Sequence, residues 1–266
     1  MMPRFIVPAM QQNIVAVFDA LVRTMPGAEL YVNSDLCWTL TPIAFAVFNS
    51  IFAARLDGST AKAQIEGAKA RAERNGVPVL WWIAPGDTPA DLPQRLTHAG
   101  FDYAATLPGM SLDLSNLRPS ESDALEDVAI ETVSDERTAQ TWCDVFARGF
   151  GFPKTIGDEF LALTVASAAD LNAAYRSYLL SWRGEPLATA ATMLTGDVVG
   201  VYNVATLPHA RRRGFGAMLT SHAADDGRGR GASVAVLQSS DAGLGVYRAL
   251  GFRESGNFQQ FIFTPP

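Results

Sequence analysis

The residues best suited to chemistry are concentrated in the segment Pro208-His-Ala-Arg-Arg-Arg-Gly-Phe-Gly-Ala-Met-Leu219. It contains three consecutive arginines and two glycines: Arg211, Arg212, Arg213, Gly214 and Gly216. The uncharged, Val-rich stretch 198–206 before it predicts a buried strand, and apolar residues at helical spacing follow it. The first N–H groups of a helix lack backbone partners and attract anions, which glycines allow to come close. We therefore predict a phosphate-binding loop, with the helix beginning near Arg212 or Arg213.

Three phosphate-binding patterns can be compared with this loop. A P-loop needs lysine after its last glycine, and no lysine follows Gly216. The dinucleotide fingerprint needs a third glycine where this chain has Leu219, and an acid about 20 residues later, for which Asp241 comes late. The third pattern, Arg/Gln-x-x-Gly-x-Gly/Ala, is met by Arg211, Gly214 and Gly216. The loop is therefore typical of a site that binds the diphosphate of a larger cofactor.

A second motif follows in residues 237–252, which end in Tyr-x-x-x-Gly-Phe at Tyr247, Gly251 and Phe252. Together the two motifs resemble the GNAT superfamily of N-acetyltransferases over about residues 175–263. Many members of that family have asparagine where this chain has Ser240, so one contact to the pantetheine arm of the cofactor is expected to differ here.

The resemblance implies an acetyl-CoA acyltransferase fold, a mixed α/β (α+β) sheet with helices, and acetyl-CoA as co-substrate. It further implies direct attack of an amine on the thioester, with strand N–H groups before the loop as donors. The expected cofactor-binding residues are Val204, Ala205, Thr206, Arg211, Arg212, Arg213, Gly214, Phe215, Gly216, Ala217, Ser240 and Tyr247.

Two residues are candidates for catalysis. The resemblance implies that Tyr247 points its hydroxyl at the sulfur and protonates the leaving thiolate, and a phenol with an ordinary pKa of about 10 can donate at neutral pH. Strand alternation predicts that Asn203 and Ala205 share one face and that Tyr202 and Val204 share the other. No carboxylate lies on this strand. We expect either a water relayed through Asn203 or through main-chain carbonyls, or an acceptor that arrives neutral.

Acceptor binding is expected from aromatic residues near the loop 149–153. The candidates are Phe150 and Phe152, together with Trp182 on a later strand. They indicate an apolar or aromatic small-molecule amine. No His and Cys cluster has metal-ligand spacing, so no metal is expected.

The chain is long enough for two lobes, and a polar, Pro-containing stretch separates them. We predict a first lobe at 1–118, a linker at 119–127 and an acetyl-CoA-binding domain at 128–266. In the first lobe, Gly76 and Gly100 frame an apolar run and a helix, much as Gly231 and Gly251 do in the second. The first lobe lacks the Arg-x-x-Gly-x-Gly loop, and it resembles the inactive half of tandem acetyltransferases.

The element order predicted for the second lobe is that of the acetyltransferase fold. The predicted strands are 128–133, 176–182, 187–194, 198–206, 233–238 and 257–263, and the predicted helices are 135–148, 158–167, the loop helix and 242–250. In the first lobe an apolar run at 77–83 precedes a helix at 90–98.

Composition limits the remaining classes of function. The chain has 266 residues and a net charge of −6, which argues against nucleic-acid and acidic-membrane partners. No apolar run reaches the roughly 20 residues of a membrane span, and the start does not look like a secretory signal. Cys37 and Cys143 suit reduced thiols, so we expect a cytoplasmic protein and leave a homodimer open. The rivals to an enzyme are an acyl-CoA-binding sensor and, more distantly, a nicotinamide-dependent oxidoreductase.

Overall fold

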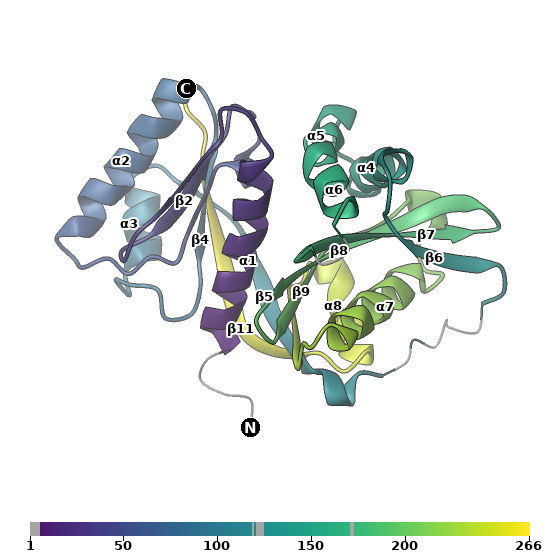
Figure 1. Ribbon diagram of the computed structural model, residues 1–266. Coiled ribbons are helices and arrows are strands. Elements are labelled where there is room, and N and C mark those ends of the chain that lie inside the picture. The colour runs from purple at the N-terminus through teal and green to yellow at the C-terminus, as the bar shows by residue number, and fades with distance from the viewer. Residues whose placement is uncertain (1–5, 119, 121–124, 171–172) are drawn as a thin grey trace.

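A computed structural model describes residues 6–118, 120, 125–170 and 173–266 (Figure 1). In this part of the chain, eleven strands form one mixed sheet, in the order β1-β2-β3-β4-β11-β5-β10-β9-β8-β7-β6. Their bounds are β1 Glu29–Val32, β2 Cys37–Leu40, β3 Ser50–Phe52, β4 Val79–Ile83, β5 Asp102–Asp113, β6 Val128–Thr132, β7 Tyr175–Trp182, β8 Glu185–Thr195, β9 Val198–Thr206, β10 Val234–Gln238 and β11 Arg253–Phe263.

Helices cover both faces of this sheet. Their bounds are α1 Ile6–Arg23, α2 Thr60–Asn75, α3 Leu92–His98, α4 Glu136–Phe150, α5 Lys154–Asp158, α6 Leu161–Ala168, α7 Phe215–Gly229 and α8 Asp241–Ala249, with 3-10 turns η1 Ala46–Phe48, η2 Leu114–Asn116 and η4 Pro208–Ala210. In Figure 1, α2 and α3 lie on the first half of the sheet, α4 to α6 lie on one face of the second half, and α7 and α8 lie on the other. None of the helices in the described part of the chain is long and apolar enough to cross a membrane.

The predicted lobes are joined through the middle of the sheet. Strand β11, from the end of the chain, is hydrogen-bonded between β4 and β5, so that Gln259 faces Ile83 on one side and Thr106 on the other. Strand β5 then pairs with β10, where Gln238 faces Gly109. The boundaries at 1–118 and 128–266 remain a prediction, and most of the predicted linker 119–127 lies outside the described residues.

Helix α1 is docked onto the second half of the sheet through one buried polar side chain. Asn13 is fully buried, and its Nδ2 donates to the carbonyl of Met193 (3.0 Å) and to Oγ1 of Thr195 (2.7 Å). Its Oδ1 accepts from the hydroxyl of Tyr202 (2.7 Å). A side-chain Cβ at Gly200 would lie 1.9 Å from Asn13 Oδ1, so only glycine permits this contact. Hydrogen bonding of this kind compensates the cost of burying an amide, and it fixes where α1 sits.

Most predicted elements are present, with shifts at the ends of helices. The loop helix begins at Phe215, later than Arg212 or Arg213, because η4 and a left-handed Gly214 (φ 84°) precede it. The predicted helix 158–167 corresponds to α6, which begins later, at Leu161, and the short helix α5 that precedes it was not predicted. The glycine at 149 and Phe150 belong to α4, so the loop expected at 149–153 is shorter than predicted.

Candidate active site

The site is created where β9 and β10 separate. These parallel strands pair only through residues 198–200 of β9 and 234–236 of β10. Beyond that point β9 continues to Thr206, paired on its other side with β8. The edge of β9 from Val201 to Thr206 therefore faces an opening rather than a strand, and its backbone N–H groups are available to a ligand.

A β-bulge in β9 corrects the strand alternation predicted from the sequence. Asn203 has a φ of 54°, and the pairing with β8 slips between Thr189 and Ala191. Asparagine tolerates this left-handed conformation better than most residues. Tyr202 and Asn203 consequently both contact side chains on the α1 and α4 face, whereas Val204 turns toward Gly216 of α7. A bulge re-aims side chains, which is why such irregularities recur next to binding sites.

The larger cavity at this opening has a volume of about 480 Å³. The residues that line it come from the end of α4, from β9, from the loop before α7 and from the start of α8. They are Gly149, Phe150, Val204, Ala205, Thr206, Ala210, Arg211, Arg212, Gly214, Phe215, Gly216, Ala217, Ser240, Ala242, Gly243, Val246 and Tyr247. Of the residues predicted to bind the cofactor, all but Arg213 lie along this groove.

The start of α7 has the properties required of an anion site. Gly214 precedes the helix in a left-handed conformation, and in the described chain no side chain caps the helix. Its first N–H groups are thus open toward the groove, where the partial charge of the helix favours phosphate. A Cβ at Gly216 would meet only ordinary contacts, 3.8 Å from Thr206 Oγ1 and 3.9 Å from Val204. Packing does not require glycine there, whereas a Cβ would occupy space in the groove, so the loop fits a bound diphosphate.

The three arginines of the loop have different surroundings. Arg211 braces the site, because its Nε donates to the carbonyl of Thr206 (3.1 Å) and its Nη2 to the carbonyl of Gly149 (2.8 Å). Arg212 lines the groove. Arg213 lies outside the lining, with its guanidinium 5.0 Å from the ring centre of Trp182. The side chains of Arg211 and Arg212 therefore border the groove, and that of Arg213 is directed to the aromatic ring instead.

Tyr247 lies where the groove meets a second cavity, and it lines both. Its ring lies against α8 at Gly243, where a Cβ would be 2.7 Å from the ring. Burial raises the pKa of the Tyr247 phenol to about 12. The hydroxyl therefore stays protonated across the physiological range and can donate a hydrogen bond.

The second cavity has a volume of about 240 Å³ and lies between the two halves of the molecule. It is lined by Ile14, Val17, Phe18, Leu21, Val47, Phe48, Trp82, Leu107, Phe150, Phe160, Val201, Tyr202, Asn203, Val204, Gln238, Ser240 and Tyr247. None of these described lining residues is charged. The two cavities share Phe150, Val204, Ser240 and Tyr247, so they form one continuous site with Tyr247 at the junction.

Of the three residues predicted to bind the acceptor, one lines the site and two do not. Phe150 lines both cavities and is 45% exposed. Phe152 lines neither and packs against Phe150 and, across the lobes, against Phe45 at 5.1 Å between ring centres. Trp182 also lines neither, and its ring packs on Phe215. Phe150 is the one of these three that the structure brings to the site.

Asn203 lines the second cavity, as its predicted role requires, although its amide is already engaged. Its Nδ2 donates to the hydroxyl of Tyr175 (3.2 Å), and its carbonyl accepts from Oγ1 of Thr189 (3.0 Å). Burial raises the pKa of the Tyr175 phenol well above its usual value, so that group stays neutral. The side-chain oxygen of Asn203 is the atom that can orient a water.

Sequence reasoning missed the walls that the first lobe supplies. Helix α1, η1 and Trp82 form much of the second cavity, and Gln238 of β10 completes it. The apolar stripe of α1 was detectable as helical periodicity, but periodicity does not say which surface it covers.

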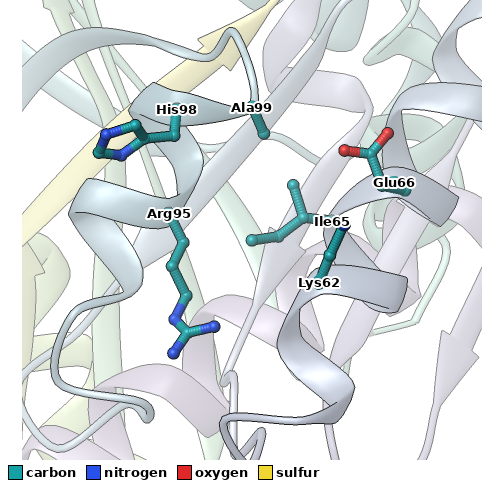
Figure 2. A pocket seen from close by; sticks show the side chains of 6 residues that line it. All are labelled: Lys62, Ile65, Glu66, Arg95, His98 and Ala99. Carbon is teal, nitrogen blue, oxygen red and sulfur yellow. The ribbon is translucent and has the colours of Figure 1, made fainter.

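The first lobe offers a third cavity, of about 280 Å³, between α2 and α3 (Figure 2). These helices flank β4 in the chain as α7 and α8 flank β10. The start of α2 is already satisfied, because Asp57 Oδ1 accepts from the N–H groups of Ser59 (2.7 Å) and Thr60 (2.8 Å). The Ser59 hydroxyl also donates to this oxygen, and its hydrogen bond together with the two N–H groups lowers the pKa of Asp57 to about 2. A carboxylate of the chain itself thus occupies the position where a phosphate would bind.

Comparison with known proteins agrees with this geometry. The model of the acetyltransferase (GNAT) domain family matches residues 116–241. A GCN5-related N-acetyltransferase from Kribbella flavida has a similar structure, with a TM-score of 0.74 and 18% identity over 100% of this chain and 98% of that one. The GCN5-related N-acetyltransferase from Sphaerobacter thermophilus gives 0.66 and 14% over 97% and 92%. A tandem GNAT protein from the clavulanic acid biosynthesis pathway gives 0.60 and 10% over 91% and 85%. At these identities the likeness concerns the fold.

Among curated proteins, the [ribosomal protein bS18]-alanine N-acetyltransferase of Escherichia coli (strain K12) is 31% identical over 84 residues. The match covers 30% of this chain and 57% of that protein, so the chain spans little more than half the length of this relative. The family model, the fold of the whole chain and the separated strands with their uncapped loop helix lead to one conclusion: residues 116–241 match an acetyltransferase (GNAT) domain, and the chain as a whole has the fold of GCN5-related N-acetyltransferases.

Proposed function

We propose that the protein is an N-acetyltransferase that moves the acetyl group of acetyl-CoA to the amine of a small acceptor. The observation that carries this proposal is the continuous site at the separation of β9 and β10. It joins an uncapped helix start, a free strand edge, Tyr247 and an apolar cavity in that order.

In this proposal each part of the site has a defined task. The N–H groups at the start of α7 and Arg212 hold the diphosphate. The free edge of β9 around Val204 to Thr206 binds the pantetheine arm and donates to the thioester oxygen as it becomes negative. The Tyr247 hydroxyl donates to the departing sulfur, and the second cavity places the amine in line with the thioester carbon.

The choice of a small acceptor rests on the second cavity. The bS18-alanine relative acts, by its name, on a residue of a ribosomal protein, so a polypeptide terminus is the competing acceptor. A cavity of about 240 Å³ bounded by both lobes favours a compact molecule. Cys37 and Cys143 are free and buried, which supports a reducing compartment such as the cytoplasm.

Binding of the cofactor is testable with a matched pair of glycine variants. Gly214→Glu places a carboxylate at the start of α7, where it repels the diphosphate. Gly231→Glu puts the same side chain on another left-handed glycine, beyond the far end of that helix. We expect calorimetry to detect CoA binding by the wild type and Gly231→Glu and none by Gly214→Glu. Equal affinities in both variants would place the cofactor elsewhere.

A second candidate function is that of a non-catalytic acyl-CoA-binding sensor. It is favoured by one observation, that no carboxylate lines the second cavity among the described residues, so a base of the usual kind is missing. A thiol-release assay with a panel of amines separates the two. Release of CoA that depends on an added amine indicates the enzyme, whereas CoA binding without release for any amine indicates the sensor.

A further inference from the structure

The cavity assigned to the acceptor has walls made mainly of aromatic and aliphatic side chains from both lobes. Phe18 and Phe48 with Trp82 form the side contributed by the first lobe, and Phe150 and Phe160 form the facing side. Rings of this kind bind another ring by edge-to-face or offset contacts. The cavity therefore suits a flat apolar group rather than a polar chain.

The same cavity offers no carboxylate among its described residues to pair with a cation. The acids on the helices that form its walls are directed elsewhere: Asp19 of α1 pairs with Arg23, Asp144 of α4 pairs with Arg148, and Asp241 at the start of α8 is exposed. Moving an ammonium from water into such a cavity is strongly unfavourable when no charge compensates it.

The polar groups that do face the cavity are neutral. The Tyr202 hydroxyl is committed to Asn13, and burial raises the pKa of that phenol well above its usual value. The amide of Gln238 is not committed, because its Nε2 is buried and has no hydrogen-bond partner among the described residues. An uncharged amine can accept from that group or donate to the amide oxygen, whereas an ammonium can only donate.

We propose that the acceptor is a primary aromatic amine, with its ring between the aromatic walls and its nitrogen between Gln238 and Tyr247. This inference rests on the proposed acetyltransferase function. An amine conjugated to a ring is weakly basic, so it is uncharged at neutral pH. It can enter the cavity without a counter-charge, and its lone pair is available without a protein base.

The reaction balances without a further reactant. The amine lone pair forms the new C–N bond at the thioester carbon, and the C–S bond breaks with its electrons going to sulfur. The nitrogen then loses one proton to water at the mouth of the site, and the thiolate, which accepts a hydrogen bond from Tyr247, gains one proton from water. The products are the acetylated amine and CoA with a free thiol.

Two isomeric amines test the proposal, because 4-methylaniline and benzylamine have the same atoms and nearly the same size. The first is neutral at pH 7, and the second is mostly an ammonium. We expect calorimetry on the CoA-saturated protein at pH 7 to show at least tenfold tighter binding of 4-methylaniline. Benzylamine binding should tighten roughly tenfold per pH unit between pH 7 and 9, while 4-methylaniline binding stays constant. Benzylamine that binds as tightly as its isomer at pH 7 would overturn the inference.

An isosteric variant provides the second arm. Gln238→Glu adds a carboxylate inside the cavity, and Gln94→Glu adds one on the exposed surface of α3. We expect Gln238→Glu to shift the preference toward benzylamine by at least tenfold and Gln94→Glu to leave it unchanged. An unchanged preference in a folded Gln238→Glu protein would contradict the assignment of the cavity.

Thiol release distinguishes failure of this inference from failure of the proposed function. Release with benzylamine or spermidine but not with 4-methylaniline would refute the aromatic-amine acceptor and leave the acetyltransferase function standing. Bound CoA with no release from any amine would refute both. Release with 4-methylaniline supports both.

Discussion

Replacing Tyr247 with phenylalanine removes one hydroxyl from the junction of the two cavities and leaves the ring in place. The ring packs against Gly243 of α8 and lies 6.0 Å from the ring centre of Phe252, and these contacts are kept in the variant. The described structure gives the hydroxyl no hydrogen bond within the protein. The variant is therefore expected to fold normally and to differ only in what it offers to a bound thioester.

The size of the effect follows from two pKa values. Burial raises the pKa of Tyr247 to about 12, whereas a free thiol has a pKa of about 8.5. Full proton transfer from the phenol to a thiolate is then uphill by about 3.5 units, or about 5 kcal/mol. Tyr247 should act by hydrogen bonding to the developing thiolate, with water completing the transfer. Hydrogen bonds to charged groups contribute about 1.5–3 kcal/mol, which corresponds to a factor of about 10 to 150 in rate.

The assay is single-turnover thiol release, which keeps product release from masking the chemical step. We expect Tyr247→Phe to lower the rate about 10- to 150-fold with CoA affinity changed less than twofold. Tyr178→Phe is the matched control, because it removes a buried phenol that bonds Asp226 and lines neither cavity. It should lose stability and keep its turnover. A Tyr247→Phe rate within threefold of wild type would refute the role of the hydroxyl, and a loss beyond about a thousandfold would refute the hydrogen-bond argument.

Three further predictions concern the docking of the lobes, the first lobe and the loop. Asn13→Leu should lower the free energy of unfolding by about 3 kcal/mol in urea titrations, because several buried groups lose their hydrogen bonds. The control Asn75→Leu, at an exposed position, should change this free energy little. Equal effects of the two variants would contradict the docking role of Asn13. Asp57→Ala should lower Tm at pH 7. Because the pKa of Asp57 in the folded protein is lowered to about 2, the difference in Tm between the variant and the wild type should shrink as pH falls below about 4. A difference in Tm that does not change with pH would argue against the role of Asp57 at the start of α2. Arg212→Gln should weaken CoA binding several-fold and Arg213→Gln should not. The reverse order in calorimetry would mean that Arg213, rather than Arg212, turns into the groove.

The cofactor half of the site could be predicted from the sequence because its chemistry is local. Arg211, Gly214 and Gly216 lie within six residues of one another, and their spacing alone defines a helix start that is open to an anion. The acceptor half could not be predicted in the same way. The walls from α1 depend on where Asn13 docks, and nothing in the local pattern of the helix indicates a partner some 180 residues away in the chain.

Two errors have specific physical causes. Strand alternation failed at Asn203 because a bulge inserts a residue into β9, and asparagine is common enough in ordinary strands and turns that its left-handed φ is not evident from sequence. Trp182 was expected at the acceptor site because it is an aromatic residue on a strand of the second lobe. It lies on β7 beside β6, at the edge of the sheet, where Phe215 and Arg213 cover it.

The position of β11 has a consequence for how the chain is made. β11 follows every other strand in chain order, yet it is hydrogen-bonded near the centre of the sheet between β4 and β5. During synthesis, the edges of β4 and β5 that pair with β11 stay unpaired until residues 253–263 leave the ribosome. Open edges of this kind invite association with other chains. A chain that ends shortly before Arg253 should therefore aggregate through both of its halves. It should not give a folded first lobe attached to an unfolded remainder.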